Sequence, residues 1–154
     1  MNKKIVITGG TGRFASALKK VKTKYKLIYP SSKKLNITNI NSIKNFLTKI
    51  KPRVIIHMAG LSRPMIQHEK KISESIKLNI IGTSNLVSVC SEMKIKIIYV
   101  STSYIYPKEK KMHKETDPLL PWNNYGWSKL GGECAVQMYK NSLIVRACVS
   151  EKPF

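Results

Sequence analysis

The chain begins with a short apolar run that leads directly into a cluster of glycines. Residues 3–8 read Lys-Lys-Ile-Val-Ile-Thr, which predicts a buried strand, and Gly9-Gly-Thr-Gly-Arg-Phe-Ala15 follows without a gap. A helix-compatible apolar segment continues from Phe14 to Val21. A strand, a glycine turn and a helix start in this order are the context that a dinucleotide-binding loop requires.

The small residues of this loop have separate physical roles. Gly9 permits the tight turn, Gly12 lets the backbone approach a pyrophosphate, and Ala15 lets the helix pack close to the strand. A plain glycine-rich turn is the competing interpretation, but the flanking strand and helix favour a cofactor site. We therefore expect the cofactor to contact Gly9, Gly12, Arg13 and Phe14.

Strand and helix patterns alternate along the rest of the chain. Further strands are expected at 25–29, 54–58, 95–100 and 142–146, and helices at 40–50, at about 69–93 and around Tyr125. Alternation of this kind predicts an α/β protein with a Rossmann-like, doubly wound parallel sheet. Right-handed crossovers make 3-2-1-4-5 the expected strand order. No repeat or long linker divides the sequence, so residues 1–154 are expected to form one domain.

Two of the expected helices have distinct faces. The helix at 40–50 has Thr38 or Asn39 as its N-cap, and its apolar face comprises Ile40, Ile43, Phe46, Leu47 and Ile50. The longer helix should turn a second apolar set toward the sheet, namely Ile72, Ile76, Ile80, Leu86 and Val89. Asn79 and Gly82-Thr83 fall inside that helix as poor helix formers.

Three of the expected strands end in small or polar residues: the glycine turn, Ala59-Gly60 and Thr102. A parallel sheet brings the carboxyl ends of its strands to one edge, where ligands bind. The second strand ends in Ser31-Ser-Lys-Lys34, without the acidic residue that holds the ribose in NAD-selective sites. Hydroxyls and cations suit a 2′-phosphate, so NADP(H) is favoured, with NAD(H) as the alternative.

Tyr125 and Lys129 are four residues apart in a stretch that is expected to be helical. This spacing puts the phenol and the ammonium on one face, one turn apart. A cation beside a phenol favours the phenolate and lowers the phenol pKa toward the range where it exchanges protons. By itself the spacing is a weak signal, because many such pairs are simply a tyrosine beside a solvated lysine.

The net charge of +20 raises the question of nucleic-acid binding. Only four of the 28 basic residues are arginine, the better residue for bidentate contacts with bases and phosphates. The lysines are spread along the chain, densest at Lys19–Lys26 and Lys108–Lys114, and are not interleaved with aromatic residues. We therefore expect no specific nucleic-acid partner, although anionic ligands would be attracted.

The cysteines and histidines do not follow the spacing of a metal site. Cys90, Cys134 and Cys148 lie far apart among apolar residues, which predicts buried, reduced thiols and no metal. No apolar run approaches the roughly 20 residues needed to cross a bilayer, and the N-terminus shows no signal peptide. The expectation is a soluble, cytoplasmic protein that does not bind membranes.

Several motifs agree in order and spacing with one known group of proteins. They are Thr8-Gly-Gly-Thr-Gly-Arg-Phe-Ala15, Leu35-Asn-Ile-Thr38, His57-Met-Ala-Gly60, Asn79-Ile-Ile-Gly-Thr83, Ser101-Thr-Ser-Tyr-Ile-Tyr106 and Tyr125-Gly-Trp-Ser-Lys129. With them the chain resembles the extended short-chain dehydrogenase/reductase superfamily. The dTDP-4-dehydrorhamnose reductase group is the most similar within it, on the motifs Ser101-Thr-Ser-Tyr-Ile-Tyr106, Glu115-Thr-Asp-Pro118 and Asn124-Tyr-Gly-Trp-Ser-Lys-Leu-Gly-Gly-Glu133.

The resemblance implies a role for each catalytic candidate. Tyr125 would donate a proton to a substrate carbonyl, and Lys129 would lower the Tyr125 pKa and hold the nicotinamide ribose. Thr102 would hydrogen-bond the same carbonyl oxygen, with Ser103 as a less favoured alternate. Asn79 would hold the central helix and strand together.

The resemblance also extends the set of cofactor residues, which comprises Gly9, Gly12, Arg13, Phe14, Ser31, Asn36, Ile37, Ala59, Gly60, Tyr125 and Lys129. Asn36 stands where an aspartate commonly reads the adenine amino group, and its side-chain oxygen could accept that bond. Pro107 replaces a common glycine or aspartate.

Members of this superfamily continue for roughly another domain, which contacts the nucleotide sugar. This chain is therefore expected to be the cofactor-binding half, with the substrate lobe missing. The favoured function is NADP(H)-dependent reduction of a nucleotide-sugar 4-ketone. One alternative is a non-catalytic dinucleotide-binding module or regulatory subunit, and another is an NAD-retaining epimerase or dehydratase. The expected partners are a nucleotide-sugar substrate and either a second copy of the chain or a separate chain that supplies the missing lobe.

Overall fold

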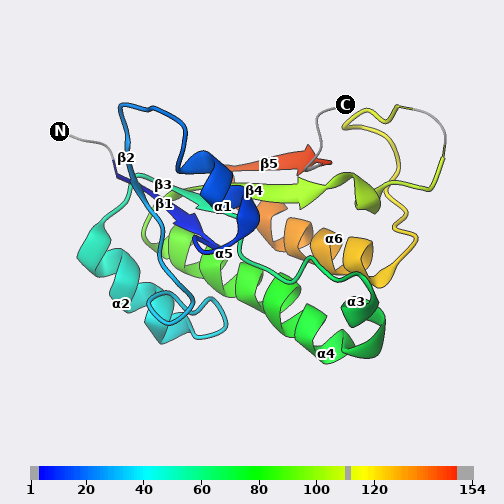
Figure 1. Ribbon diagram of the computed structural model, residues 1–154, viewed down its shortest axis with the longest axis horizontal. Helices are drawn as coiled ribbons and strands as arrows, with labels where there is room; N and C mark the ends of the chain where they lie inside the picture. Colours follow the sequence, from blue (N-terminus) through cyan, green and yellow to red (C-terminus); the bar gives the residue numbers. More distant parts are fainter. Residues whose placement is uncertain (1–3, 110–111, 149–154) are drawn as a thin grey trace.

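The computed structural model describes residues 4–109 and 112–148 (Figure 1). Its elements, in chain order, are β1 (Lys4–Thr8), α1 (Arg13–Leu18), β2 (Lys26–Ile28), α2 (Ile40–Ile50), β3 (Val54–His57), α3 (Ile66–Lys70), α4 (Ile72–Ser75), the π-helix η1 (Ile76–Ile81), α5 (Gly82–Glu92), β4 (Lys96–Thr102), the 3-10 turn η2 (Ser103–Ile105), α6 (Asn124–Gln137) and β5 (Ser142–Ala147). Parts of the sequence predictions therefore lie outside the described residues. They are Lys3 of the first expected strand, residues 110–111 of the run at Lys108–Lys114, and residues 149–154 of the expected domain.

The five strands form one parallel sheet, which confirms the α/β, Rossmann-like class. The expected order 3-2-1-4-5 is wrong, because the observed order is β2-β1-β3-β4-β5. β2 has only three residues, all at least partly exposed, and it occupies the sheet edge. β3 reads Val-Ile-Ile-His, and Ile55 and His57 are fully buried. A strand of this composition buries more apolar surface beside β1, in the middle of the sheet, than it would beyond β2.

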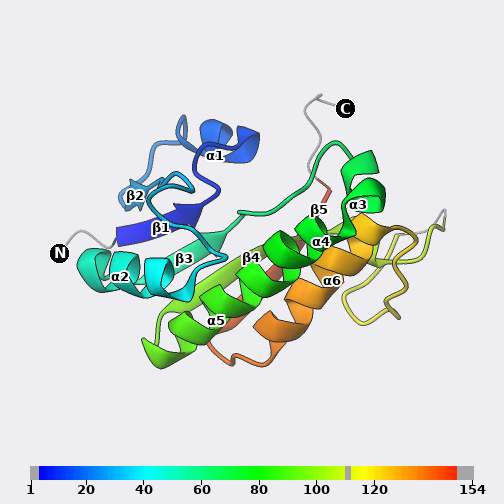
Figure 2. The ribbon, with the colours of Figure 1, turned by 90° about the horizontal axis from the view of Figure 1, so that it is seen from below.

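Helices cover the two faces of the sheet unequally. Figure 2 shows α1 on one side of the strands and α2, α5 and α6 on the other. The chain crosses the sheet in one direction from β1 to β2 and in the opposite direction from β2 onward. Right-handed crossovers therefore place α1 on the face opposite the later helices.

The core lies between the sheet and the layer formed by α2, α5 and α6. Its buried residues include Ile43 and Leu47 of α2, Leu86 and Val89 of α5, and Val136 of α6. Asn39 is the N-cap of α2, as one of the two predictions had it, and its Oδ1 accepts a hydrogen bond from the Ser42 N–H at 3.0 Å. This cap satisfies one of the free amides of the first turn.

The long helix expected at 69–93 is interrupted. Lys71 leaves helical geometry between α3 and α4, and the π-helix η1 separates α4 from α5. Leu86 and Val89 are fully buried as predicted, but Ile72 and Ile76 are 52% and 42% exposed, so their predicted orientation is wrong. The wider turn of the π-helix shifts the register of the residues before it, and this part packs against α6.

The face of the sheet on the α1 side has apolar residues that no described helix covers at β4 and β5. Ile98 pairs with Leu143 and Val100 with Val145 along these strands. Leu143 and Val145 are 49% and 40% exposed. A parallel sheet is normally covered on both faces, so this surface is suited to pack against a further element.

The cysteine prediction holds at one position only. Cys90 is buried in the core, and burial raises the pKa of its thiol to about 12. Cys134 and Cys148 are exposed, on the outer face of α6 and just after β5, so their expected burial is wrong. Residues 4–109 and 112–148 contain no cluster of side chains suited to bind a metal ion. The same residues include no helix long and apolar enough to cross a membrane.

Candidate active site

A cavity of about 840 Å³ opens at the carboxyl ends of β1, β3 and β4. It brings together most of the residues predicted from the sequence: Gly9, Gly12, Arg13, Phe14, Ala59, Gly60, Thr102, Tyr125 and Lys129. These residues come from three strand ends and from two helices, α1 and α6, that are far apart in the chain. The volume is within the usual range for a cavity that holds a cofactor or substrate.

Gly9 shapes the cavity floor through its backbone. Its φ of +70° lies in the left-handed region that favours glycine. A Cβ at this position would lie 3.0 Å from the backbone nitrogen of Ala59, so a side chain would also push the β1 and β3 loops apart. The position therefore requires glycine both for the turn and for the close approach of the two loops.

A buried hydrogen-bond chain joins the ends of β1 and β3. The Thr8 hydroxyl accepts bonds from the backbone amides of Met58 and Ala59, both at 3.1 Å, and lies 2.7 Å from His57 Nδ1. With two amides donating to it, the hydroxyl donates its own proton to Nδ1. His57 Nε2 then carries the ring proton and donates to the Thr83 hydroxyl at 3.0 Å. Burial, together with the charge of Lys129, lowers the His57 pKa to about 3, so the ring is neutral.

A second, smaller cavity of about 210 Å³ adjoins the first. Gly9, Ala59 and Gly60 line both, and the smaller one adds Ser32, Asn36 and Ile37. Ser31 lines neither cavity, because the chain turns there and the Ser31 carbonyl accepts bonds from the Lys34 and Leu35 amides.

The Asn36 side chain is engaged in a local turn. Its Oδ1 accepts from the Thr38 amide at 3.0 Å and from the Thr38 hydroxyl at 2.8 Å. A carbonyl oxygen has two lone pairs, so the atom expected to read an adenine amino group is already used. The Asn36 amide nitrogen is the group left to face the smaller cavity.

Thr102 and Tyr125 meet at the wall of the larger cavity. Burial raises the pKa of Tyr125 above its ordinary value. A hydrogen bond with the Thr102 side chain and the positive charge of Arg63 oppose this shift without reversing it. Tyr125 is therefore a protonated phenol at neutral pH, which suits a proton donor.

The Lys129 ammonium contacts a strand carbonyl and an aromatic ring. It donates to the carbonyl oxygen of Val100 at 2.8 Å and lies 4.0 Å from the centroid of the Tyr99 ring. Burial lowers the Lys129 pKa to about 7, although the nearby Glu133 carboxylate opposes this. Arg63 is a cation that lowers the Tyr125 pKa, and the electrostatic role expected for Lys129 stays a prediction.

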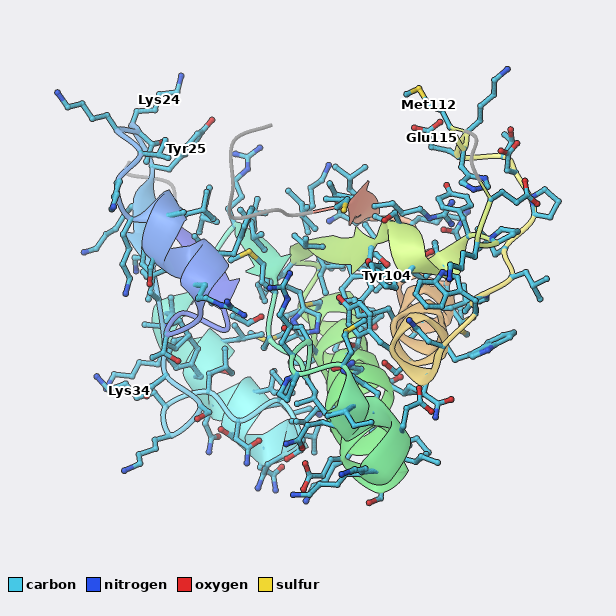
Figure 3. The ribbon with its side chains drawn as sticks, turned by 45° about the vertical axis from the view of Figure 1, so that its right-hand side comes forward. Lys24, Tyr25, Lys34, Tyr104, Met112 and Glu115 are labelled. Atoms are coloured by element: carbon cyan, nitrogen blue, oxygen red, sulfur yellow. The ribbon has the colours of Figure 1, made fainter. Side chains whose placement is uncertain are left out.

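Aromatic rings hold Tyr125 on two sides. The imidazole of His68 lies 5.0 Å from the Tyr125 ring between centroids, and Tyr104 meets that ring edge-on at 5.7 Å. Tyr104 in turn stacks on Trp122 at 5.1 Å. Figure 3 shows Tyr104 in the interior of the view, whereas Lys24 and Lys34 project outward.

Asn79 joins three parts of the site. Its Nδ2 donates to the Leu61 carbonyl at 2.9 Å and to the Ser128 hydroxyl at 2.8 Å, and its Oδ1 accepts from the Leu61 amide at 2.7 Å. Ser128 then donates to the carbonyl of Tyr125. The π-helix thus anchors both the loop after β3 and the helix that carries Tyr125, which is a structural role of the kind expected for Asn79.

Ser62, Arg63 and Tyr104 are among the cavity residues that were not predicted from the sequence, and each brings a polar side chain. Tyr104 falls inside the Ser101–Tyr106 motif, so its neighbours could have pointed to it. Arg63 follows Ala59-Gly60 closely and is one of only four arginines, which is the available signal for it. Neither feature by itself shows that a side chain faces a cavity.

A glycine loop, a threonine at a strand end and a Tyr-x-x-x-Lys helix around one cavity define a dinucleotide-binding protein of the short-chain dehydrogenase/reductase class. The family model described as RmlD substrate binding domain matches residues 3–149. The chain belongs to this family.

Known proteins agree with this assignment. The chain is 31% identical over 144 residues to methionine adenosyltransferase 2 subunit beta of Xenopus laevis, covering 88% of this chain and 43% of the relative. It is 26% identical to the spore coat polysaccharide biosynthesis protein SpsK of Bacillus subtilis, covering 93% and 52%. The crystal structure of dTDP-4-dehydrorhamnose reductase from Bacillus anthracis in complex with NADP superimposes with a TM-score of 0.89 at 29% identity, covering 95% and 53%. The chain thus spans about half the length of these relatives.

Proposed function

We propose that the protein takes part in the NADP(H)-dependent reduction of a nucleotide-sugar 4-ketone. The observation that carries this proposal is the meeting of Thr102, Tyr125 and the glycine loop at one cavity. NADPH, when bound, supplies the hydride. Support for this cofactor comes from the solved relative in complex with NADP and from the absence of an acidic residue at the end of β2.

The residues of this chain supply binding and proton transfer. Tyr125 is protonated at neutral pH and donates its phenolic proton to the carbonyl oxygen as that oxygen gains charge. Thr102 is 5% exposed, and its hydroxyl orients the same oxygen. Gly9 and Gly12 leave the backbone free of side chains where a pyrophosphate would lie.

Calorimetry on the full chain tests the cofactor part. We expect NADPH to bind more tightly than NADH, and Gly12→Val to abolish binding of both. Gly131→Ala, at a glycine outside both cavities, is the control. Failure of the wild-type chain to bind either cofactor refutes the proposal. NAD that stays bound through purification would instead favour an epimerase or dehydratase.

Turnover tests the chemistry. dTDP-4-dehydrorhamnose is the first substrate to use, with loss of nicotinamide absorbance as the signal. Turnover by the wild-type chain, alone or with a chain that carries the other half of the family fold, supports the reductase. Cofactor binding without turnover in either case favours the second candidate.

The second candidate is a dinucleotide-binding subunit without turnover. The position of Lys129 favours it, because the ammonium donates to the Val100 carbonyl and lies over the Tyr99 ring. A relative named as a subunit of methionine adenosyltransferase 2 points the same way.

The proposed function also includes a protein partner. The uncovered face at Leu143 and Val145 is suited to a second copy of the chain or to a separate chain that supplies the other half of the fold. Sedimentation of the wild type and of Leu143→Lys separates a dimer that depends on this face from a monomer.

We place the protein in the cytoplasm, because all three cysteines are free thiols.

A further inference from the structure

The larger cavity is positively charged. Its lining includes three cationic side chains, Arg13, Arg63 and Lys129, and none of the described residues that line it is acidic. A cavity with unbalanced positive charge and low-dielectric walls concentrates anions. Part of this charge suits the phosphates of a cofactor, but the three cations lie at different places along the cavity.

Two of the three cations are already accounted for. Arg13 begins α1 directly after the glycine loop, at the end of the cavity where the proposed pyrophosphate lies. Lys129 is buried, and its ammonium is held by the Val100 carbonyl and the Tyr99 ring. Arg63 is different, because its side chain is exposed on the loop between β3 and α3.

Arg63 lies at the Tyr125 end of the cavity. Both residues line it, and the charge of Arg63 lowers the pKa of the Tyr125 phenol. The loop that carries Arg63 is attached to the helix that carries Tyr125. Just after this loop, α3 receives bonds from Asn124: its Nδ2 donates to Glu69 Oε2 at 2.7 Å and to the His68 carbonyl at 3.3 Å.

We propose that Arg63 recognises an anionic group of the substrate, a phosphate or a carboxylate, and holds it beside the carbonyl that faces Tyr125. This inference rests on the proposed function, because it assigns a specificity-determining residue to the same site. The planar guanidinium forms two parallel hydrogen bonds to phosphate or carboxylate oxygens, which an ammonium does not. In a chain whose basic residues are mostly lysine, an arginine at this position fits that geometry.

Titration of nucleotide sugars into the full chain, in the presence of NADP⁺, tests the assignment. The probes are UDP-glucose, whose anionic group is the diphosphate, and UDP-glucuronate, which adds a carboxylate on the sugar ring. We expect Arg63→Gln to weaken binding of an anionic probe by about tenfold or more, the scale of a hydrogen bond to a charged group. The affinity of Arg63→Lys should lie between those of the wild type and Arg63→Gln, since lysine keeps the positive charge but cannot form the two parallel hydrogen bonds of a guanidinium.

The control is Arg53→Gln, because Arg53 is also exposed but precedes β3 at the opposite end of the strand. Equal weakening of both probes by Arg63→Gln identifies the diphosphate as the bound group, and weakening of UDP-glucuronate alone identifies the ring carboxylate. Unchanged affinity of Arg63→Gln for both probes overturns the assignment, as does absence of probe binding by a wild-type chain that binds NADPH. Failure to bind NADPH refutes the proposed function alone, and the same titration without cofactor then tests Arg63.

Discussion

The ammonium of Lys129 lies 4.0 Å from the centroid of the Tyr99 ring, and the residue as a whole is 8% exposed. The ring face and the Val100 carbonyl replace the water that a lysine ordinarily keeps. This replacement is incomplete, and burial therefore lowers the Lys129 pKa to about 7. A lysine in this state changes its charge near neutral pH, which has a measurable consequence for stability.

Stability should rise with pH because of Lys129. Its pKa is about 7 in the folded protein and 10.5 in the unfolded chain, so the unfolded chain binds more protons at this position between these values. The free energy of unfolding then increases with pH across this window, by at most about 1.4 kcal/mol per pH unit. Urea unfolding at several pH values measures the slope, which Lys129→Met should reduce and the exposed control Lys33→Met should leave unchanged. An unaltered slope in Lys129→Met would contradict the prediction.

Tyr125→Phe should separate proton donation from cofactor binding. The phenol is replaced by a ring of the same shape, so the packing against His68 and Tyr104 is kept. We expect turnover of a keto-sugar nucleotide to fall by about 10²–10⁴-fold, the usual contribution of a positioned acid, with NADPH affinity unchanged. Tyr25→Phe, at an exposed tyrosine, should match the wild type. Equal turnover by Tyr125→Phe and the wild type would exclude Tyr125 as the donor.

Two glycines of α6 should respond differently to alanine. A Cβ at Gly126 would collide with the backbone carbonyl of Tyr104 and approach Pro121 to 2.9 Å. A Cβ at Gly131 would lie 2.8 Å from Cδ1 and 2.9 Å from Cγ1 of Ile80, so that one side chain would have to shift. We expect Gly126→Ala to destabilise the protein by about 1–3 kcal/mol through overpacking. Gly131→Ala should cost less than Gly126→Ala, because the helix preference of alanine, about 1 kcal/mol over glycine, offsets the shift of Ile80. Thermal unfolding of both variants tests the contrast, and similar losses in the two would refute it.

The two faces of the sheet should differ in their sensitivity to truncation. Ile97 is fully buried against the helix layer, whereas Leu143 is 49% exposed on the opposite face. Ile97→Ala should cost about 2–5 kcal/mol of unfolding free energy, as for other buried aliphatic residues. Leu143→Ala should change it by about 0.5 kcal/mol in the isolated chain. A large loss for Leu143→Ala in dilute solution would mean that the face is already covered, and sedimentation would then show a dimer.

Much of the site could be predicted because of one regularity of parallel sheets. Their strands end at the same edge, so a glycine turn, Ala59-Gly60 and Thr102 meet wherever the strands lie in the sheet. The i,i+4 spacing likewise puts Tyr125 and Lys129 on one face of α6. These predictions depend on local pattern alone, and they survive the error in strand order.

Two other predictions depended on backbone geometry that the hydrophobic pattern does not encode. Ser31 lines neither cavity, and its carbonyl accepts bonds from the Lys34 and Leu35 amides in a local turn. The outward position of Ile72 follows from the π-helix and from packing against α6. The spacing of apolar residues does not show where a helix widens to a π-helix or where a loop forms a tight turn. The sequence pattern therefore indicated neither the turn at Ser31 nor the outward position of Ile72.

By itself, the sequence determined the α/β class and the residues found at the strand ends, because both follow from periodicity and glycine placement along the chain. Only the tertiary structure decided that β3 lies beside β1, since strand order depends on the relative burial of whole strands. It also decided which groups surround the two side chains of the Tyr-x-x-x-Lys motif. The fold turns the Lys129 ammonium to Val100 and Tyr99, and the charge of Arg63, from another loop, acts on the Tyr125 phenol. Electrostatic interactions depend on distance in space, and that distance is set by packing.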